Sequence, residues 1–241
     1  MDTNWISRGG KFTDLPDTIF YAILGAILSE ALVFYVLSKG NLSITSTLLA
    51  TYPIYTVIFS GVINKEMLTL LQLLLVILIV IGILLACKEK NNYNKFNKKE
   101  LLLPIFTAIS IGFADTISKT SINNTSSFSF LIAIALVQIP VAFIYLKIKK
   151  QKIIKEFKLV KTDFSIYKYS LLGSLFNIIG TGLLYISFNY ALVSIVSPIT
   201  AAHSVLVVIY SVLILKEKTS TYNRIGILMT LFGVIVLSIY A

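Results

Sequence analysis

Eight long apolar runs constrain the fold of this chain more than any other feature of its sequence. Each has about 18–22 residues, the length that a helix needs to cross the hydrocarbon core of a bilayer. Because hydrocarbon offers no water to the backbone, each run must satisfy its own N–H and C=O groups as a helix. The sequence therefore predicts an all-α membrane protein with about eight transmembrane helices, at residues 19–37, 43–63, 67–86, 101–118, 127–146, 169–188, 193–215 and 222–240.

Composition agrees with this class and excludes an ordinary soluble domain. The mean hydropathy is +0.86, and 56% of the residues are hydrophobic while 13% are charged. The net charge of +10 comes from basic residues in loops between apolar runs, where orientation and anionic headgroups account for them. We therefore expect membrane lipids as partners and no nucleic acid.

Part of the chain occurs twice, at an offset of 151 residues. Residues 43–66 align without a gap on residues 194–217, with identity at ten of 24 positions, and the match continues to Gly82 and Gly233. Between the two Lys-Glu turns the predicted chain crosses the membrane five times. Five is odd, so the two copies have opposite orientations, which is the inverted-topology repeat typical of secondary transporters.

The repeat gives the predicted domain boundaries. A polar N-terminal segment covers residues 1–17 and lacks the apolar core of a cleavable signal peptide. A partial first repeat of three helices covers residues 18–87, and a basic linker covers 88–100. A second repeat of five helices covers 101–241 and contains a basic loop at 147–168.

Basic residues predict the orientation in the membrane. Of the lysines and arginines, 17 fall on one predicted side and four on the other. The positive-inside rule places the first side in the cytoplasm and both termini outside. We expect a multi-pass protein of the plasma or inner membrane.

Two segments carry a resemblance to a known family. The pattern KGNLSITSTLLA…INKE…GILLA recurs as YALVSIVSPITA…LKEK…GVIVL, and AISIGFADTISK looks like the opening helix of a second copy. This pattern resembles the EamA repeat of the drug/metabolite transporter superfamily. The resemblance implies five plus five helices, whereas three plus five are counted here. Either two helices precede residue 1, through truncation or a misassigned start, or the chain is a short variant. It also implies cytoplasmic termini, the opposite of what the basic residues predict.

Three ionisable residues fall inside the apolar runs: Glu30, Asp115 and His203. A charge at membrane depth costs a few kcal/mol, about 2.5–3.5 on insertion scales, so it normally faces a cavity or a partner. We predict substrate binding or proton coupling for them, with Glu30 as the strongest candidate. The alternative is structural: Glu30 is neutral and hydrogen-bonded, and Asp115 lies near the interface beside Lys119.

Polar side chains on later helices form a second group of candidates. Asn177, Thr181 and Tyr185 recur every four residues and share one helix face, and Gln138 is a further candidate. Such a face suits a polar organic solute, and it suits interhelical hydrogen bonds equally well.

The remaining candidates are structural. Ser46 with Ala50 and Ser197 with Ala201 are small-xxx-small pairs at equivalent places in the two copies, so they predict close helix packing. At the two turns, a role in anchoring the turn is predicted for Lys65, Glu66, Lys216 and Glu217, with gating as the alternative.

The function predicted from these features is secondary transport of a small organic metabolite by alternating access. The sequence has no phosphate loop, nucleophile elbow or HExxH motif, so we predict neither an enzyme nor a cofactor, and its single cysteine, Cys87, with one histidine predicts no metal site. Two alternatives stay open: a non-transporting interaction subunit, and a flippase for lipid-linked substrates. A three-helix half leaves one cavity wall open unless a second chain fills it, so a homodimer is one expectation.

Overall fold

Helices are the regular secondary structure in the described part of the chain. The computed structural model describes residues 15–38, 45, 48–87, 98–148, 164–214, 216 and 220–240, and no strand occurs among them. The elements are α1 (Leu15–Gly25), the π-helix η2 (Ala26–Ala31), α2 (Leu32–Leu37), α4 (Tyr52–Ile63), α5 (Leu70–Ala86), α6 (Lys98–Asn124), α7 (Ser127–Ile148), α9 (Phe164–Ser187), α10 (Val193–Ala201), α11 (His203–Leu213) and α12 (Thr221–Ile239). The predicted all-α fold is confirmed.

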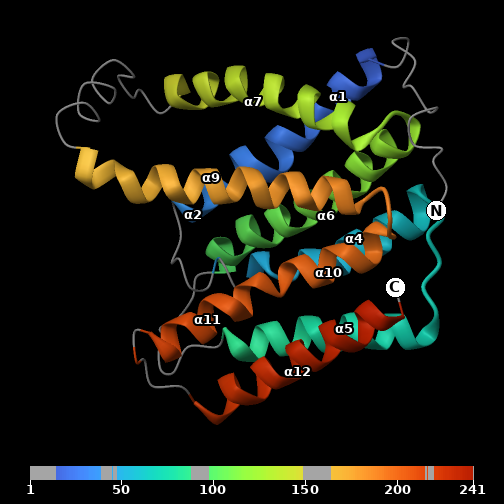
Figure 1. Cartoon of the computed structure of the whole chain (residues 1–241), viewed down its shortest axis with the longest axis vertical. Coiled ribbons are helices and arrows are strands. Elements are labelled where there is room, and N and C mark those ends of the chain that lie inside the picture. The colour runs from blue at the N-terminus through green and yellow to red at the C-terminus, as the bar shows by residue number, and fades with distance from the viewer. Residues whose placement is uncertain are drawn as a thin grey trace.

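Six helices are long and apolar enough to cross a membrane within the described ranges: Pro16–Leu37, Leu102–Asn124, Ser127–Ile148, Tyr167–Ser187, Val193–Tyr210 and Thr221–Ile239. The shorter apolar helices Tyr52–Ile63 and Leu70–Ala86 lie in the two other predicted spans. When α1, η2 and α2 are taken as one span and α10 and α11 as another, consecutive spans run in alternating directions along the bundle (Figure 1). Their outer faces carry large apolar side chains such as Leu136, Leu228 and Phe232, as a helix in hydrocarbon requires.

Three helices begin several residues before the predicted membrane spans. α1 begins at Leu15 inside the predicted polar segment, α6 begins at Lys98 inside the predicted linker, and α9 begins at Phe164 inside the predicted basic loop. Polar residues can continue a helix beyond the hydrocarbon, and 27 residues at 1.5 Å each reach about 40 Å, which includes the headgroup layers.

The helices of the two aligned segments are interrupted at equivalent places. The predicted span 43–63 has a turn at Ala50 and Thr51 before α4, and the predicted span 193–215 is divided at Ala202 into α10 and α11. The backbone N–H of Thr51 donates to Leu48 O and that of Ala202 to Ile199 O, at 3.2 and 3.3 Å. Thr51 and Ala202 are 151 residues apart.

The turns that precede α5 and α12 also share their local structure. Lys65 and Lys216, 151 residues apart, both have φ of 56°, and they are the non-glycine residues with positive φ in the described chain. α5 then begins with a capping box formed by Thr69 and Gln72. α12 begins with the equivalent capping box, formed by Ser220 and Asn223.

α5 and α12 lie side by side and antiparallel (Figure 1). Gln72 at the start of α5 donates to Tyr240 O at the end of α12, at 2.8 Å. In return, Asn223 at the start of α12 donates to Ala86 O at the end of α5, at 2.7 Å. The two N-terminal turns therefore lie at opposite ends of this helix pair.

Glycines bring these two helices into backbone contact. A Cβ on Gly82 would lie 2.5 Å from Thr230 Oγ1, and one on Gly233 would lie 2.7 Å from Ile79. A Cβ on Gly226 would overlap the backbone of Ala86. The absence of side chains at these positions allows the close approach that stabilises helix pairs in lipid.

We predict opposite effects for alanine at two helical glycines. Gly226→Ala should lower the free energy of unfolding by about 1–3 kcal/mol through overpacking. Gly180→Ala, where a Cβ meets nothing within 4 Å, should raise it by about 0.5–1 kcal/mol because alanine favours the helix. Thermal unfolding of the two variants in detergent checks this, and a shift in the same direction for both would contradict it.

Candidate functional site

A cavity of about 960 Å³ lies between η2, α2, α7 and α9. Its lining runs along α7 from Leu131 in the second turn to Leu146 near the end, and along α9 from Gly173 to Gly182. Its polar lining residues are Glu30, Gln138, Tyr145, Ser174, Asn177 and Thr181. Its size is that of a site for a small organic ligand.

Glu30 stands on the π-helical turn η2 of the first span. Gln138 Nε2 on α7 donates to Glu30 Oε1 at 2.5 Å, and the Glu30 side chain is half-buried. A π-turn displaces the residues that follow it and occurs frequently at functional sites. Of the candidates predicted from the sequence, the structure thus joins Glu30 and Gln138 directly.

The opposite wall comes from α9. Asn177 and Thr181 line the cavity, as their shared helix face predicts, and Ser174 joins them from the turn before. Tyr185, predicted to belong to the same set, is not in the lining. Most other lining residues are apolar or small, among them Phe34, Val141 and Ile178.

Three aromatic rings pack directly beyond the inner end of the cavity. Tyr185 packs edge-on against Phe130, with ring centroids 4.9 Å apart, and against Phe188, at 5.8 Å. Phe130 lies one helical turn beyond Ile134, and Tyr185 lies one turn beyond Thr181, both of which line the cavity. All three rings are buried. We call them the aromatic floor, because they separate the cavity from the far end of the bundle.

The carboxylate of Glu66, in the turn after α4, binds the start of α10. Its Oε1 accepts from the backbone N–H of Val193 at 3.1 Å, and its Oε2 accepts from the N–H and hydroxyl of Ser194 at 3.0 and 2.5 Å. These are the first residues of α10, so the carboxylate satisfies unpaired donors of a helix N-terminus and complements its dipole. Glu66 is therefore more than a turn residue.

Lys119 on α6 binds the turn between α9 and α10, directly before the residues that Glu66 binds. Its ammonium donates to Phe188 O and to Ala191 O, the latter at 3.1 Å. The sequence placed Lys119 in a loop after a span ending at residue 118. That placement was wrong, because α6 continues to Asn124 and the Lys119 side chain is buried. Together, Glu66 and Lys119 with the α9–α10 turn form what we call the polar clamp.

Asp115 belongs to a separate, tightly bonded group between α4, α6 and α10. Ser197 Oγ donates to Asp115 Oδ2 at 2.6 Å and lies 3.2 Å from Thr56 Oγ1, and the Tyr52 hydroxyl donates to Ser197 O at 3.1 Å. Asp115 and Ser197 are buried, and neither lines the described cavities. This central polar cluster thus joins the two interrupted helices.

The other predicted residues lie apart from the cavity. His203 is exposed at the start of α11, where its Nδ1 lies 2.8 Å from Thr200 O. Ala50, Ser197 and Ala201 are buried, as close packing predicts. Ser46 and Glu217 lie outside the described residues.

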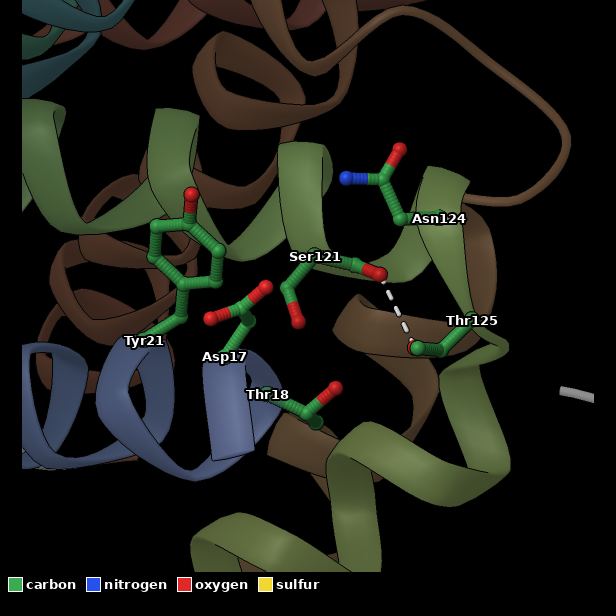
Figure 2. Close-up of a pocket in the computed structure, with 6 residues that line it drawn as sticks. All are labelled: Asp17, Thr18, Tyr21, Ser121, Asn124 and Thr125. Atoms are coloured by element: carbon green, nitrogen blue, oxygen red, sulfur yellow. Dashed lines mark hydrogen bonds between the residues drawn. The ribbon is translucent and has the colours of Figure 1, made fainter. Parts of the chain in front are cut away.

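A second, polar pocket of about 270 Å³ lies between the start of α1 and the end of α6. Figure 2 shows Asp17, Thr18 and Tyr21 on α1 facing Ser121 and Asn124 on α6 and Thr125 directly after it. Ser121 Oγ is buried and has no hydrogen-bond partner among the described residues. This pocket is at the end of the bundle that holds the polar clamp.

Sequence reasoning missed the aromatic floor and the hydrogen bonds of the polar clamp. Phe130 and Phe188 are ordinary members of apolar runs, so nothing in their spacing distinguishes them. The one available signal was the charge of Lys119 next to a predicted span, since a lysine that close to hydrocarbon needs acceptors.

Known proteins resemble this chain at three levels. The family model of the Triose-phosphate Transporter family matches residues 5–238. An uncharacterized protein of Methanocaldococcus jannaschii is 32% identical over 87 residues, which is 36% of this chain and 64% of that protein's length. One solved crystal structure is similar at a TM-score of 0.58 and 12% identity, over 99% of this chain and 92% of that one, which is a likeness of fold.

Apolar helices around a cavity with a few polar lining residues define a multi-pass α-helical membrane protein. The chain belongs to the triose-phosphate transporter family, which is part of the drug/metabolite transporter superfamily. The superfamily indicated by the sequence resemblance is thus confirmed, whereas the narrower EamA assignment stays a prediction.

We predict different effects for alanine at two buried serines. Ser197→Ala removes the donor to Asp115 and should lower the free energy of unfolding by about 1.5–3 kcal/mol, the value for a hydrogen bond to a charged group. Ser121→Ala removes a buried hydroxyl without a partner and should leave stability unchanged or raise it by about 1 kcal/mol. Thermal unfolding in detergent measures both. Equal losses would show that Ser121 has a partner.

Proposed function

We propose that this transporter moves a small polar organic solute by alternating access and binds it in the cavity between η2, α7 and α9. The observation that carries this proposal is the bonded pair of Glu30 and Gln138 inside a cavity of about 960 Å³. An intramembrane carboxylate is costly and is normally kept for function. The amide of Asn177 and the hydroxyl of Thr181 supply further partners for a polar solute.

The difference between the two ends of the bundle supports alternating access. The cavity reaches Tyr145 and Leu146 in the last turn of α7, and the aromatic floor and polar clamp lie toward the other end of the bundle. A cavity that reaches one end and a packed seal at the other is the arrangement of one alternating-access state. Lys147 and Lys168 lie at the first of these ends, in the last turn of α7 and the second turn of α9, so we infer that this state faces the cytoplasm.

Two related halves supply the motion in this proposal. Equivalent helix interruptions, turn conformations and capping boxes recur 151 residues apart, and α5 runs antiparallel to α12. These observations favour an inverted repeat, whose halves rock against each other around a midplane site.

Glu30 is the proposed proton-coupling group. Gln138 holds one of its oxygens, and Tyr145 on α7 is the other titratable group in the described lining. Tyr185 on α9 lies beyond the lining in the aromatic floor. A carboxylate with one amide partner can bind a proton when the cavity opens to one side of the membrane and release it when the cavity opens to the other.

We predict that Glu30→Gln abolishes pH-driven transport and leaves membrane insertion intact. Glutamine keeps the shape and the hydrogen-bonding capacity of the side chain, but it cannot carry a proton at neutral pH. Proteoliposomes containing a pH-sensitive dye would report proton movement on addition of a panel of polar metabolites, with a loss of at least about 100-fold for the variant. His203→Gln, at an exposed position outside the cavity, is the matched control. Unchanged proton movement in Glu30→Gln would refute the coupling role.

A further prediction concerns the polar clamp. In a Cys87→Ser background, a cysteine at the cavity-lining Ala135 should react with a membrane-impermeant maleimide from the open side only. Glu66→Gln removes the charge that binds the start of α10, so reaction from the clamp side should rise several-fold. Asp17→Asn, a carboxylate at the same end outside the clamp, is the control. No increase in Glu66→Gln would mean that the clamp does not close this end.

A further inference from the structure

The offset of 151 residues also relates two helices that line the cavity. It pairs the first span, Pro16–Leu37, with α9, and the ends of these helices, Leu37 and Ser187, agree with it to within one residue. The two helices run in opposite directions along the bundle (Figure 1). Glu30 on the first span is equivalent to Thr181 on α9, and both line the cavity. The cavity thus lies between two equivalent, antiparallel helices.

Phe34 and Tyr185 are equivalent residues in opposite surroundings. Phe34 lies one turn after Glu30, and Tyr185 lies one turn after Thr181. Tyr185 is 6% exposed within the aromatic floor, whereas Phe34 lines the cavity and is 62% exposed. Because the two helices are antiparallel, Phe34 lies toward the open end of the cavity. One aromatic side chain is therefore packed at the closed end, and its equivalent is unpacked at the other.

The surface that receives Tyr185 also has an equivalent. Tyr185 belongs to one cluster of buried residues with Ala22 and Ala26 of the first span. The equivalents of these alanines on α9 are Gly173 and Asn177, and both line the cavity. A Cβ on Gly173 would meet no atom within 4 Å. A face with so small a residue and free space in front of it can receive a bulky side chain or a neighbouring helix at close range.

We propose that Phe34 is the gate of the open end, and that in the opposite state its ring packs against the Gly173 face of α9. This packing is the equivalent of that of Tyr185 with Ala22 and Ala26 in the present structure. The inference rests on the proposed function, because it needs a cavity that opens to each side in turn. It adds to that function one gate residue and the surface that receives its ring.

The exchange of the two aromatic side chains is balanced in apolar burial. The ring of Phe34 leaves the cavity for a packed position as the ring of Tyr185 leaves the aromatic floor. Burying an apolar ring away from water is favourable, so the gain at one end offsets the loss at the other. Two states of similar free energy are what a protein needs in order to alternate between them.

Disulfide formation tests the approach of Phe34 to Gly173. Both residues are replaced by cysteine in the full chain with a Cys87→Ser background, and oxidation is catalysed with copper phenanthroline. A disulfide needs its two Cβ atoms about 3.5–4.5 Å apart, and no atom of Phe34 lies within 4 Å of a Cβ placed on Gly173. Phe34→Cys with Leu172→Cys is the matched control, because Leu172 is exposed and outside the described lining.

We expect slow disulfide formation between Phe34→Cys and Gly173→Cys in the otherwise unchanged protein. Glu66→Gln weakens the polar clamp and favours the opposite state, so it should raise this rate several-fold. The rate of the control pair should not change. The disulfide is measured in proteoliposomes as thiols that react with a maleimide only after a reductant is added.

The role of the ring is tested separately, by leakage of sorbitol from proteoliposomes. In a Glu66→Gln background, Phe34→Ala should leave the open end unsealed whenever the clamp end opens. Trapped radiolabelled sorbitol should then escape several-fold faster than with Glu66→Gln alone. Phe34→Tyr introduces the residue found at the equivalent position of α9, and it should keep the seal.

Three results would overturn the inference. A disulfide at Gly173→Cys that forms no faster than at Leu172→Cys, while Ala135→Cys becomes reactive from the clamp side, would show that the cavity changes side without Phe34 closing on α9. Equal leakage with Phe34→Ala and Phe34→Tyr would show that the ring is not the seal. Both results leave the proposed function standing. If neither the disulfide nor clamp-side reaction of Ala135→Cys is detected in either background, the alternation between two states is refuted, and the proposed function with it.

Discussion

The cost of an unpaired polar group in hydrocarbon organises this structure. Backbone groups are satisfied within helices, and the few polar side chains at membrane depth pair with one another or with exposed carbonyls. Asp115 pairs with Ser197, Lys119 with the carbonyls of the α9–α10 turn, and Glu66 with the start of α10. Each pairing joins helices that are distant in sequence, so the polar residues define the tertiary contacts that apolar surfaces alone leave open.

Charged side chains serve two different purposes in this molecule. Glu66 and Lys119 use their capacity on backbone groups and hold one end of the bundle closed. Glu30 has one amide partner and faces a cavity. Side chains whose hydrogen-bonding capacity is used on backbone groups, as in Glu66 and Lys119, suit a structural role. The Glu30 carboxylate has one partner and can still bind a ligand. This contrast, rather than the presence of charge alone, distinguishes the candidate site.

Much of the fold could be read from the sequence. Helix formation in all eight apolar runs followed from their length, and the offset of 151 residues matched equivalent turns at Lys65 and Lys216. Glu30, Gln138 and Asn177 were candidates from residue type and were found at one cavity. Tyr185 and His203 were candidates on the same grounds, yet one packs in the aromatic floor and the other is exposed.

The sequence by itself determined that this chain is an all-α membrane protein with repeated segments, because apolar length and backbone hydrogen bonding leave a helix no alternative in a bilayer. Only the tertiary structure decided which polar residues meet. A helix presents its side chains in every direction, and the face that turns inward depends on packing between helices such as α7 and α9. The π-turn that carries Glu30 has no local sequence signal. The charge of Lys119 signals that it needs acceptors, but those acceptors lie about 70 residues further along the chain.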